Sequence, residues 1–133
     1  RFEVNKNNVF TNAAMLAAYS SGEDWLEQVT DYIQGNVELL GNFLQQNIPA
    51  VKLIEPEATY LVWLDCRELG LDARQLETFL ANEARMATNP GHWFGREGAG
   101  FVRINVACPR SVLETALEQL ENAVTRLFDE DGG

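Results

Sequence analysis

The sequence is short of the residues that bind metals or form disulfides. Two cysteines and one histidine occur among 133 residues. Cys66 and Cys108 belong to no CxxC or CxxH pattern, and His92 has no second histidine nearby, so neither a zinc site nor a disulfide framework is predicted. We therefore expect no metal and two reduced thiols, which are typical of cytoplasmic proteins.

Positive charge and long apolar runs are also scarce. Ten Lys and Arg stand against twenty Asp and Glu, which gives a net charge of -10. Nucleic-acid binding depends on basic side chains that neutralise phosphates, so no nucleic-acid partner is expected. No apolar run is long enough for a membrane span, and no signal peptide is visible. The chain begins with Arg1 instead of Met, so we expect an excised piece of a longer protein or a processed product.

The spacing of the apolar residues predicts an α+β fold. From Trp25 to Leu44 they recur every three or four residues, as on one face of a long helix that Pro49 ends. Ser21 and Asp24 resemble a capping box for this helix. The other expected elements are a helix at 11–19, strands at 51–55, 59–65 and 101–107, a helix capped by Asp72 and Gln75, a loop at 89–100, and a last helix after Pro109. This order predicts a small sheet covered on one side by helices.

The end of the chain is polar and contains two glycines, so residues 130–133 are expected to be a disordered tail.

Arg103 is the most informative candidate for a ligand-binding residue. Side chains alternate between the two faces of a strand. In strand 101–107 one face is apolar and suits a core, whereas the other carries Phe101, Arg103 and Asn105. A guanidinium in this setting can hold a carboxylate through two parallel hydrogen bonds. A solvent-facing arginine is the alternative, because charged residues are mostly exposed.

The remaining candidates carry weaker signals. Loop 89–100 holds four of the ten glycines, but its spacing is neither GxGxxG nor a P-loop, so it is either a binding loop or a plain surface loop. His92 is expected to be an ordinary loop histidine. The cysteines are expected to be inert packing residues. The residues alone therefore predict an α+β domain with one notable arginine.

Three segments carry a resemblance to a known family. They are AAYSSGEDWLEQVTDYIQGN, PEATYLVWLDCRELGLDARQLETFL and ATNPGHWFGREGAGFVRINVACPRSVLETALEQL, and the resemblance covers about residues 12–127. They resemble the C-terminal small domain of fold-type I pyridoxal-phosphate (PLP) enzymes of aminotransferase class I/II. Within that class they are most similar to the cystathionine β-lyase-like C–S lyases of the MalY/PatB type. The first segment resembles the helix that links the large and small domains. The resemblance implies that residues 1–20 are the remnant of a large domain or a connection to it, and that residues 21–129 form the small domain.

The resemblance implies a substrate-binding role for part of this chain. It implies that Arg103 binds the α-carboxylate of an amino-acid substrate such as cystathionine. Gly91 and Phe94 match the loop that approaches the active site beside that arginine, and Asn105 is a further candidate. Ala58 stands where the family usually has Gly, which leaves the contact of that turn with the substrate open.

The resemblance also implies what must lie outside this chain. PLP needs a Schiff-base lysine, and that lysine belongs to the large domain. Lys6 and Lys52 are the only lysines here, and neither lies in a Ser-x-x-Lys setting. We therefore expect no catalytic residue in this chain, no activity of the chain alone, and a homodimeric parent. The parent is expected to be a C–S lyase or an aminotransferase. The alternative is a stand-alone regulatory module that senses amino acids.

Overall fold

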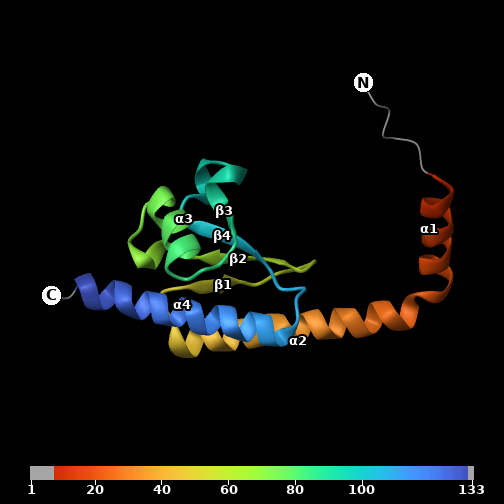
Figure 1. Ribbon diagram of the computed structural model, residues 1–133, viewed down its shortest axis with the longest axis horizontal. Coiled ribbons are helices and arrows are strands. Elements are labelled where there is room, and N and C mark those ends of the chain that lie inside the picture. The colour runs from red at the N-terminus through yellow and green to blue at the C-terminus, as the bar shows by residue number, and fades with distance from the viewer. Residues whose placement is uncertain (1–7, 132–133) are drawn as a thin grey trace, which may run out of the picture. The chain divides into compact units, whose positions relative to one another are not determined.

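The computed structural model describes residues 8–131 as a succession of helices and short strands (Figure 1). The elements are α1 Val9–Ser21, α2 Glu23–Asn47, β1 Lys52–Ile54, β2 Leu61–Asp65, η1 Arg67–Leu69, α3 Ala73–Asn82, β3 Asn89–Pro90, η2 Gly91–Phe94, η3 Arg96–Gly98, β4 Phe101–Asn105 and α4 Arg110–Asp131. The expected tail at 130–133 overlaps the end of α4, and residues 132–133 lie outside the described part.

The described chain divides into two units that meet within α2, after Gln34. The first unit holds α1 and the start of α2, and none of the side chains from 8 to 34 is buried. Most of its large apolar side chains are exposed; they include Phe10, Leu16, Tyr19, Trp25 and Leu26. The second unit holds all the strands and has a core of its own.

The sheet is antiparallel throughout, in the order β1-β2-β4-β3. β3 was not expected, because its two residues lie in the segment predicted to be a loop. Pro90 lacks a backbone N–H and therefore suits an edge strand. The pairing of β3 with β4 fixes the start of the glycine-rich segment against the sheet.

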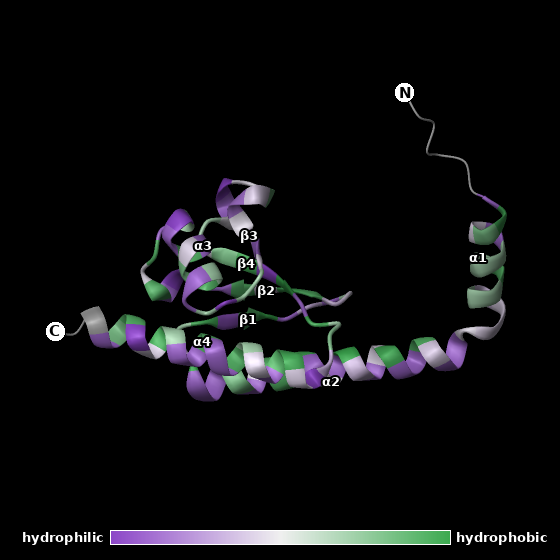
Figure 2. Cartoon of the chain, viewed as in Figure 1, coloured by the Kyte–Doolittle hydropathy of each residue, from purple (hydrophilic) through white to green (hydrophobic). Residues whose placement is uncertain are grey.

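One face of the sheet forms the core of the second unit. The alternation predicted for strand 101–107 is confirmed, since Val102, Ile104 and Val106 are buried and Arg103 and Asn105 are not. The helices α2 and α4 alternate between hydrophilic and hydrophobic residues along their length (Figure 2), as amphipathic helices do. The buried apolar side chains that they and α3 contribute are Val37, Leu40, Leu44, Leu76, Phe79, Leu80, Leu113, Leu117, Leu120, Ala123 and Val124. The predicted α+β fold with a small sheet is confirmed.

The expected capping box at Ser21 is wrong. Ser21 is the last residue of α1, and its hydroxyl donates to the carbonyl oxygen of Ala17 at 3.3 Å. Only Gly22 separates α1 from α2. The Ser21 hydroxyl is therefore used within the preceding helix and does not cap the next one.

The predicted cap of α3 is confirmed. The Asp72 carboxylate accepts hydrogen bonds from the backbone N–H groups of Arg74 (2.9 Å) and Gln75 (2.8 Å), and the Gln75 side chain accepts one from the backbone N–H of Asp72 (2.9 Å). We expect Asp72→Ala to lower the free energy of unfolding by about 1 kcal/mol, because two helix N–H groups lose their acceptor. Urea denaturation of the chain measures the loss. Asp72→Asn keeps an acceptor and is the control; an equal loss in both variants would contradict this explanation.

Candidate functional site

Three side chains lie in one row across the face of the sheet that forms no core. In the strand register, Arg103 of β4 is opposite Trp63 of β2 and Asn89 of β3. Residues that pair directly across strands project from the same face. The arginine therefore lies between an indole on one side and an amide on the other, and all three side chains are only partly buried.

Phe94, the last residue of η2, covers the row of Trp63, Arg103 and Asn89. Its ring centroid lies 5.2 Å from that of Trp63, with the planes at 79°, which is an edge-to-face contact. The same ring lies 4.5 Å from the Cζ atom of Arg103, in cation–π geometry. Phe94 is 52% exposed, so it is not a core residue. The structure thus brings together Arg103 and Phe94, two of the residues singled out in the sequence.

The guanidinium of Arg103 has more donors than protein acceptors. Nη2 donates to Oδ1 of Asn89 at 3.3 Å, whereas the buried Nε has no acceptor among the described residues. An arginine carries five N–H donors. A buried donor without a partner in the protein points to a ligand or a water molecule. Arg103 is therefore well suited to hold an anion.

Gly91 allows two backbone segments of the glycine-rich loop to approach each other closely. A Cβ at this position would collide with the carbonyl oxygen of Gly98 and would lie 2.5 Å from that of Phe101. Gly95 has a φ of 134°, which side chains rarely tolerate. These glycines allow η2 and η3 to pack closely, and this packing places Phe94 over Arg103. A direct contact of Gly91 with substrate stays a prediction.

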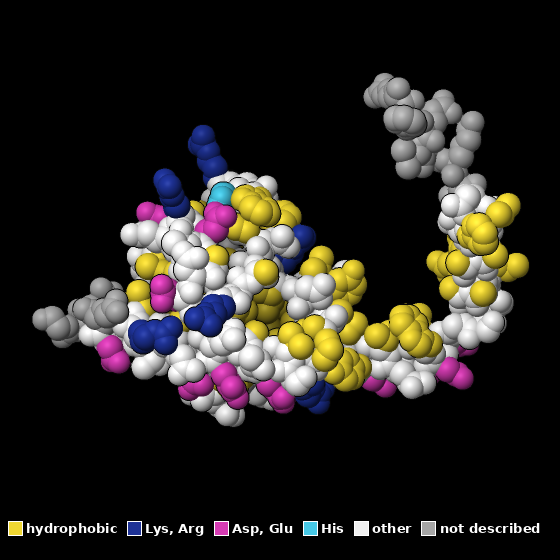
Figure 3. All heavy atoms as spheres, viewed as in Figure 1, with side chains coloured by type: hydrophobic (Ala, Val, Ile, Leu, Met, Phe, Trp, Pro, Cys, Tyr) yellow, Lys and Arg dark blue, Asp and Glu magenta, His cyan; other side chains and the backbone are white. Residues whose placement is uncertain are grey.

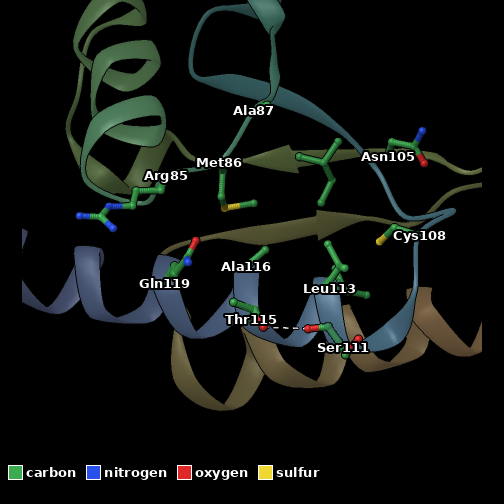
Figure 4. Close-up of a pocket in the computed structure, with 12 residues that line it drawn as sticks. Arg85, Met86, Ala87, Asn105, Cys108, Ser111, Leu113, Thr115, Ala116 and Gln119 are labelled. Carbon is green, nitrogen blue, oxygen red and sulfur yellow. Dashed lines mark hydrogen bonds between the residues drawn. The ribbon is translucent and has the colours of Figure 1, made fainter.

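Asn105 is separate from this cluster. Its side-chain oxygen accepts a hydrogen bond from the backbone N–H of Ala107 at 2.8 Å. Asn105 also lines a cavity of about 540 Å³ between α4 and the segment at 85–87, to which Met86, Cys108 and Leu113 contribute as well (Figure 4). Arg103 does not line this cavity. A role for Asn105 in binding substrate stays a prediction.

Ala58, which stands where the resembled family usually has Gly, lies in the turn before β2. Ala58 is not among the described residues with positive φ, but the next residue, Thr59, has a φ of 69°. Its hydroxyl accepts a hydrogen bond from the backbone N–H of Leu61 at 3.1 Å. The left-handed residue of this turn is therefore Thr59, immediately before β2.

The side chains of Cys66, Lys52 and His92 carry groups that act as nucleophiles, cofactor anchors or bases in other proteins. Burial raises the pKa of the Cys66 thiol to about 12, so this thiol stays protonated. Lys52, the one lysine in residues 8–131, is paired with Glu68, and Lys6 lies outside the described residues. His92 lies 3.9 Å from Glu77 and is seen among exposed hydrophobic and acidic side chains (Figure 3).

Between residues 8 and 131 no three His, Cys, Asp or Glu side chains lie close enough together to hold a metal ion. In the same range no helix has the length and apolar character needed to cross a membrane.

Comparison with known proteins identifies relatives by sequence. No protein-family model matches the chain. Protein MalY of Escherichia coli is 37% identical over 117 residues, and cystathionine β-lyase PatB of Bacillus subtilis is 34% identical over 118 residues. An aspartate aminotransferase of Pyrococcus horikoshii is 28% identical over 117 residues. These matches cover 88%, 89% and 86% of this chain, in that order.

The fold of this chain is shared with part of a solved structure that contains pyridoxal 5′-phosphate. Cystalysin from Treponema denticola, whose structure contains pyridoxal 5′-phosphate, superposes with a TM-score of 0.87 at 33% identity over 90% of this chain. The chain spans about 30% of the length of MalY, PatB and cystalysin. It matches the C-terminal region of such proteins.

Proposed function

We propose, since this chain is a C-terminal small domain of the fold-type I pyridoxal-phosphate enzymes, that it binds the α-carboxylate of an amino-acid substrate in a C–S β-lyase. The observation that carries the proposal is the guanidinium of Arg103, which lies under Phe94 and keeps a buried Nε without a protein acceptor. The name of the relative PatB, cystathionine β-lyase, supports a lyase of that type.

Arg103 acts by fixing one end of the substrate. A carboxylate gains charge-assisted hydrogen bonds from two guanidinium nitrogens, and the planar fork sets its orientation. Phe94 covers one face of the guanidinium, and a charge that is partly covered by an apolar ring attracts a carboxylate more strongly than one fully in water. A substrate held by its carboxylate presents its α-carbon bonds in one orientation, and this orientation favours cleavage of one of them.

The cofactor must be held outside the described part of this chain. Lys52, on strand β1, is already paired with Glu68 of η1. The described residues therefore do not fit a Schiff-base anchor. PLP, when bound, withdraws electrons from the α-carbon of an amino acid. We place its binding site in a large domain of the full-length protein, which we propose to be a cytoplasmic homodimer. The two free cysteines are in keeping with that compartment.

The test is release of pyruvate from cystathionine by the full-length protein loaded with PLP. The expected products are pyruvate, ammonia and a thiol, with one water consumed, and pyruvate is measured with lactate dehydrogenase. The chain 1–133 by itself is expected to give none. A full-length protein that binds no PLP and releases no pyruvate would overturn the proposal.

An aminotransferase is the second candidate, because the aspartate aminotransferase of P. horikoshii matches nearly the same length of this chain. In that case the full-length protein transfers the amino group to a 2-oxo acid and releases no pyruvate from cystathionine. The role proposed for Arg103 is the same in both reactions.

A further inference from the structure

Asn89 is the residue of the cluster that the sequence did not single out. It is one of the two residues of β3, and its register partner is Arg103. The following Pro90 pairs with Val102 and has a fixed φ. The backbone of Asn89 is therefore held firmly beside β4, and its Oδ1 meets Nη2 of Arg103 at 3.3 Å.

A second arginine, Arg67 of η1, lies beside the same sheet and has an acidic partner. Arg67 also lies over an aromatic ring, with its Cζ 4.8 Å from the centroid of Phe101. Its Nε and Nη2 both donate to the carboxylate of Asp65, at 2.9 and 2.7 Å. This hydrogen bonding to Arg67 lowers the pKa of Asp65. The charge of Arg67 is thus neutralised within the protein, and the edge of its guanidinium that pairs best with a carboxylate is occupied.

We propose that Asn89 is a positioning residue that holds Arg103 without neutralising it. The inference rests on the proposed function. The amide oxygen accepts one hydrogen bond from Nη2 and limits rotation of the guanidinium, while Phe94 covers one of its faces. Because the amide is neutral, the positive charge and the other donors of Arg103 stay available for the carboxylate of the substrate. An acid at this position would bind Arg103 as Asp65 binds Arg67.

The experiment compares two ligands that differ only in the carboxylate. L-Methionine and 3-(methylthio)propylamine have the same side chain and amino group. Their dissociation constants for the full-length PLP-loaded protein are measured by titration calorimetry, and the ratio reports the preference for the carboxylate. We expect Asn89→Asp to reduce this preference about tenfold or more, through weaker binding of L-methionine alone. Asn89→Ala is expected to reduce it less, because the arginine loses its support but keeps its charge.

The control variant carries the same change in charge elsewhere. Asn122→Asp alters an exposed residue of α4 whose side chain bonds, within residues 8–131, only to the carbonyl oxygen of Glu118. It is expected to leave both dissociation constants unchanged. A general loss of structure would weaken both ligands together, and thermal unfolding of each variant checks for it.

The outcomes separate this inference from the function on which it rests. If Arg103→Ala abolishes the preference while Asn89→Asp and Asn89→Ala keep it, the inference about Asn89 is overturned and the proposed function stands. If the unmodified protein shows no preference, or Arg103→Ala leaves it unchanged, the proposed function itself is overturned.

Discussion

Replacement of Arg103 by alanine in the full-length protein is expected to lower kcat/KM for an amino-acid substrate by about 10²-fold. Two hydrogen bonds from a charged donor to a carboxylate contribute about 3 kcal/mol together, and each 1.4 kcal/mol is a factor of about ten. We expect KM to rise and kcat to fall, because the arginine both binds the substrate and orients its α-carbon. Steady-state kinetics with cystathionine measures both constants.

Two variants make this result specific to the geometry of Arg103. Arg103→Lys keeps the charge but lacks the planar fork, so it is expected to recover only a small part of the activity. Arg67→Ala removes an arginine that also lies over an aromatic ring of the same sheet but is already paired with Asp65. It is expected to leave kcat/KM unchanged. Full recovery of kcat/KM in Arg103→Lys, or an equal loss of kcat/KM in Arg67→Ala, would contradict the binding of the substrate carboxylate by Arg103.

Features that depend on short stretches of sequence were predictable. The cap at Asp72 involves residues within three positions of each other, so the sequence contains all of it. The alternation in strand 101–107 follows from the two-residue period of a strand, and it correctly placed Arg103 on the face away from the core. The error at Ser21 has a local cause too, because a serine can bond within the helix that it ends as well as cap the next one.

Features that depend on pairing between distant segments were not predictable from patterns. The row of Trp63, Arg103 and Asn89 joins three strands, and it exists only because β2 and β3 flank β4 in one register. A two-residue strand next to a proline gives no periodic signal. The contact of Phe94 with Arg103 depends in turn on the close packing of Gly91 against Gly98. The resemblance to a family indicated Phe94 but gave no reason for its position.

Asn36 is the residue of the core that pattern reasoning missed. It lies on α2 among apolar residues and is completely buried. Its Nδ2 donates to the carbonyl oxygens of Val106 (2.9 Å) and Cys108 (3.0 Å), and its Oδ1 accepts from Nε of Arg110 at 3.2 Å. One amide thus ties α2 to the segment between β4 and α4. No sequence period marks such a residue, because its partners lie about 70 positions away.

We expect Asn36→Leu to lower the free energy of unfolding of the chain by about 3 kcal/mol. Leucine has the same branched shape, although it is bulkier, and it leaves two carbonyl oxygens and the Arg110 Nε without their present partner. An unsatisfied buried polar group costs about 1–3 kcal/mol. Against a typical total stability of about 5–15 kcal/mol the loss is large. Urea denaturation measures it.

Asn47→Leu is the matched control on the same helix. Asn47 is exposed, and its side chain bonds only to the carbonyl oxygen of Phe43, one turn earlier. This variant is expected to change stability by less than about 0.5 kcal/mol. If Asn36→Leu changed the free energy of unfolding as little as Asn47→Leu, the buried amide would not be needed to hold β4 against α2. The position of Arg103 would then depend on the pairing of β2, β3 and β4 alone. A large loss confined to Asn36→Leu would instead mean that the strand carrying Arg103 is fixed from both ends, by its neighbours in the sheet and by this one amide.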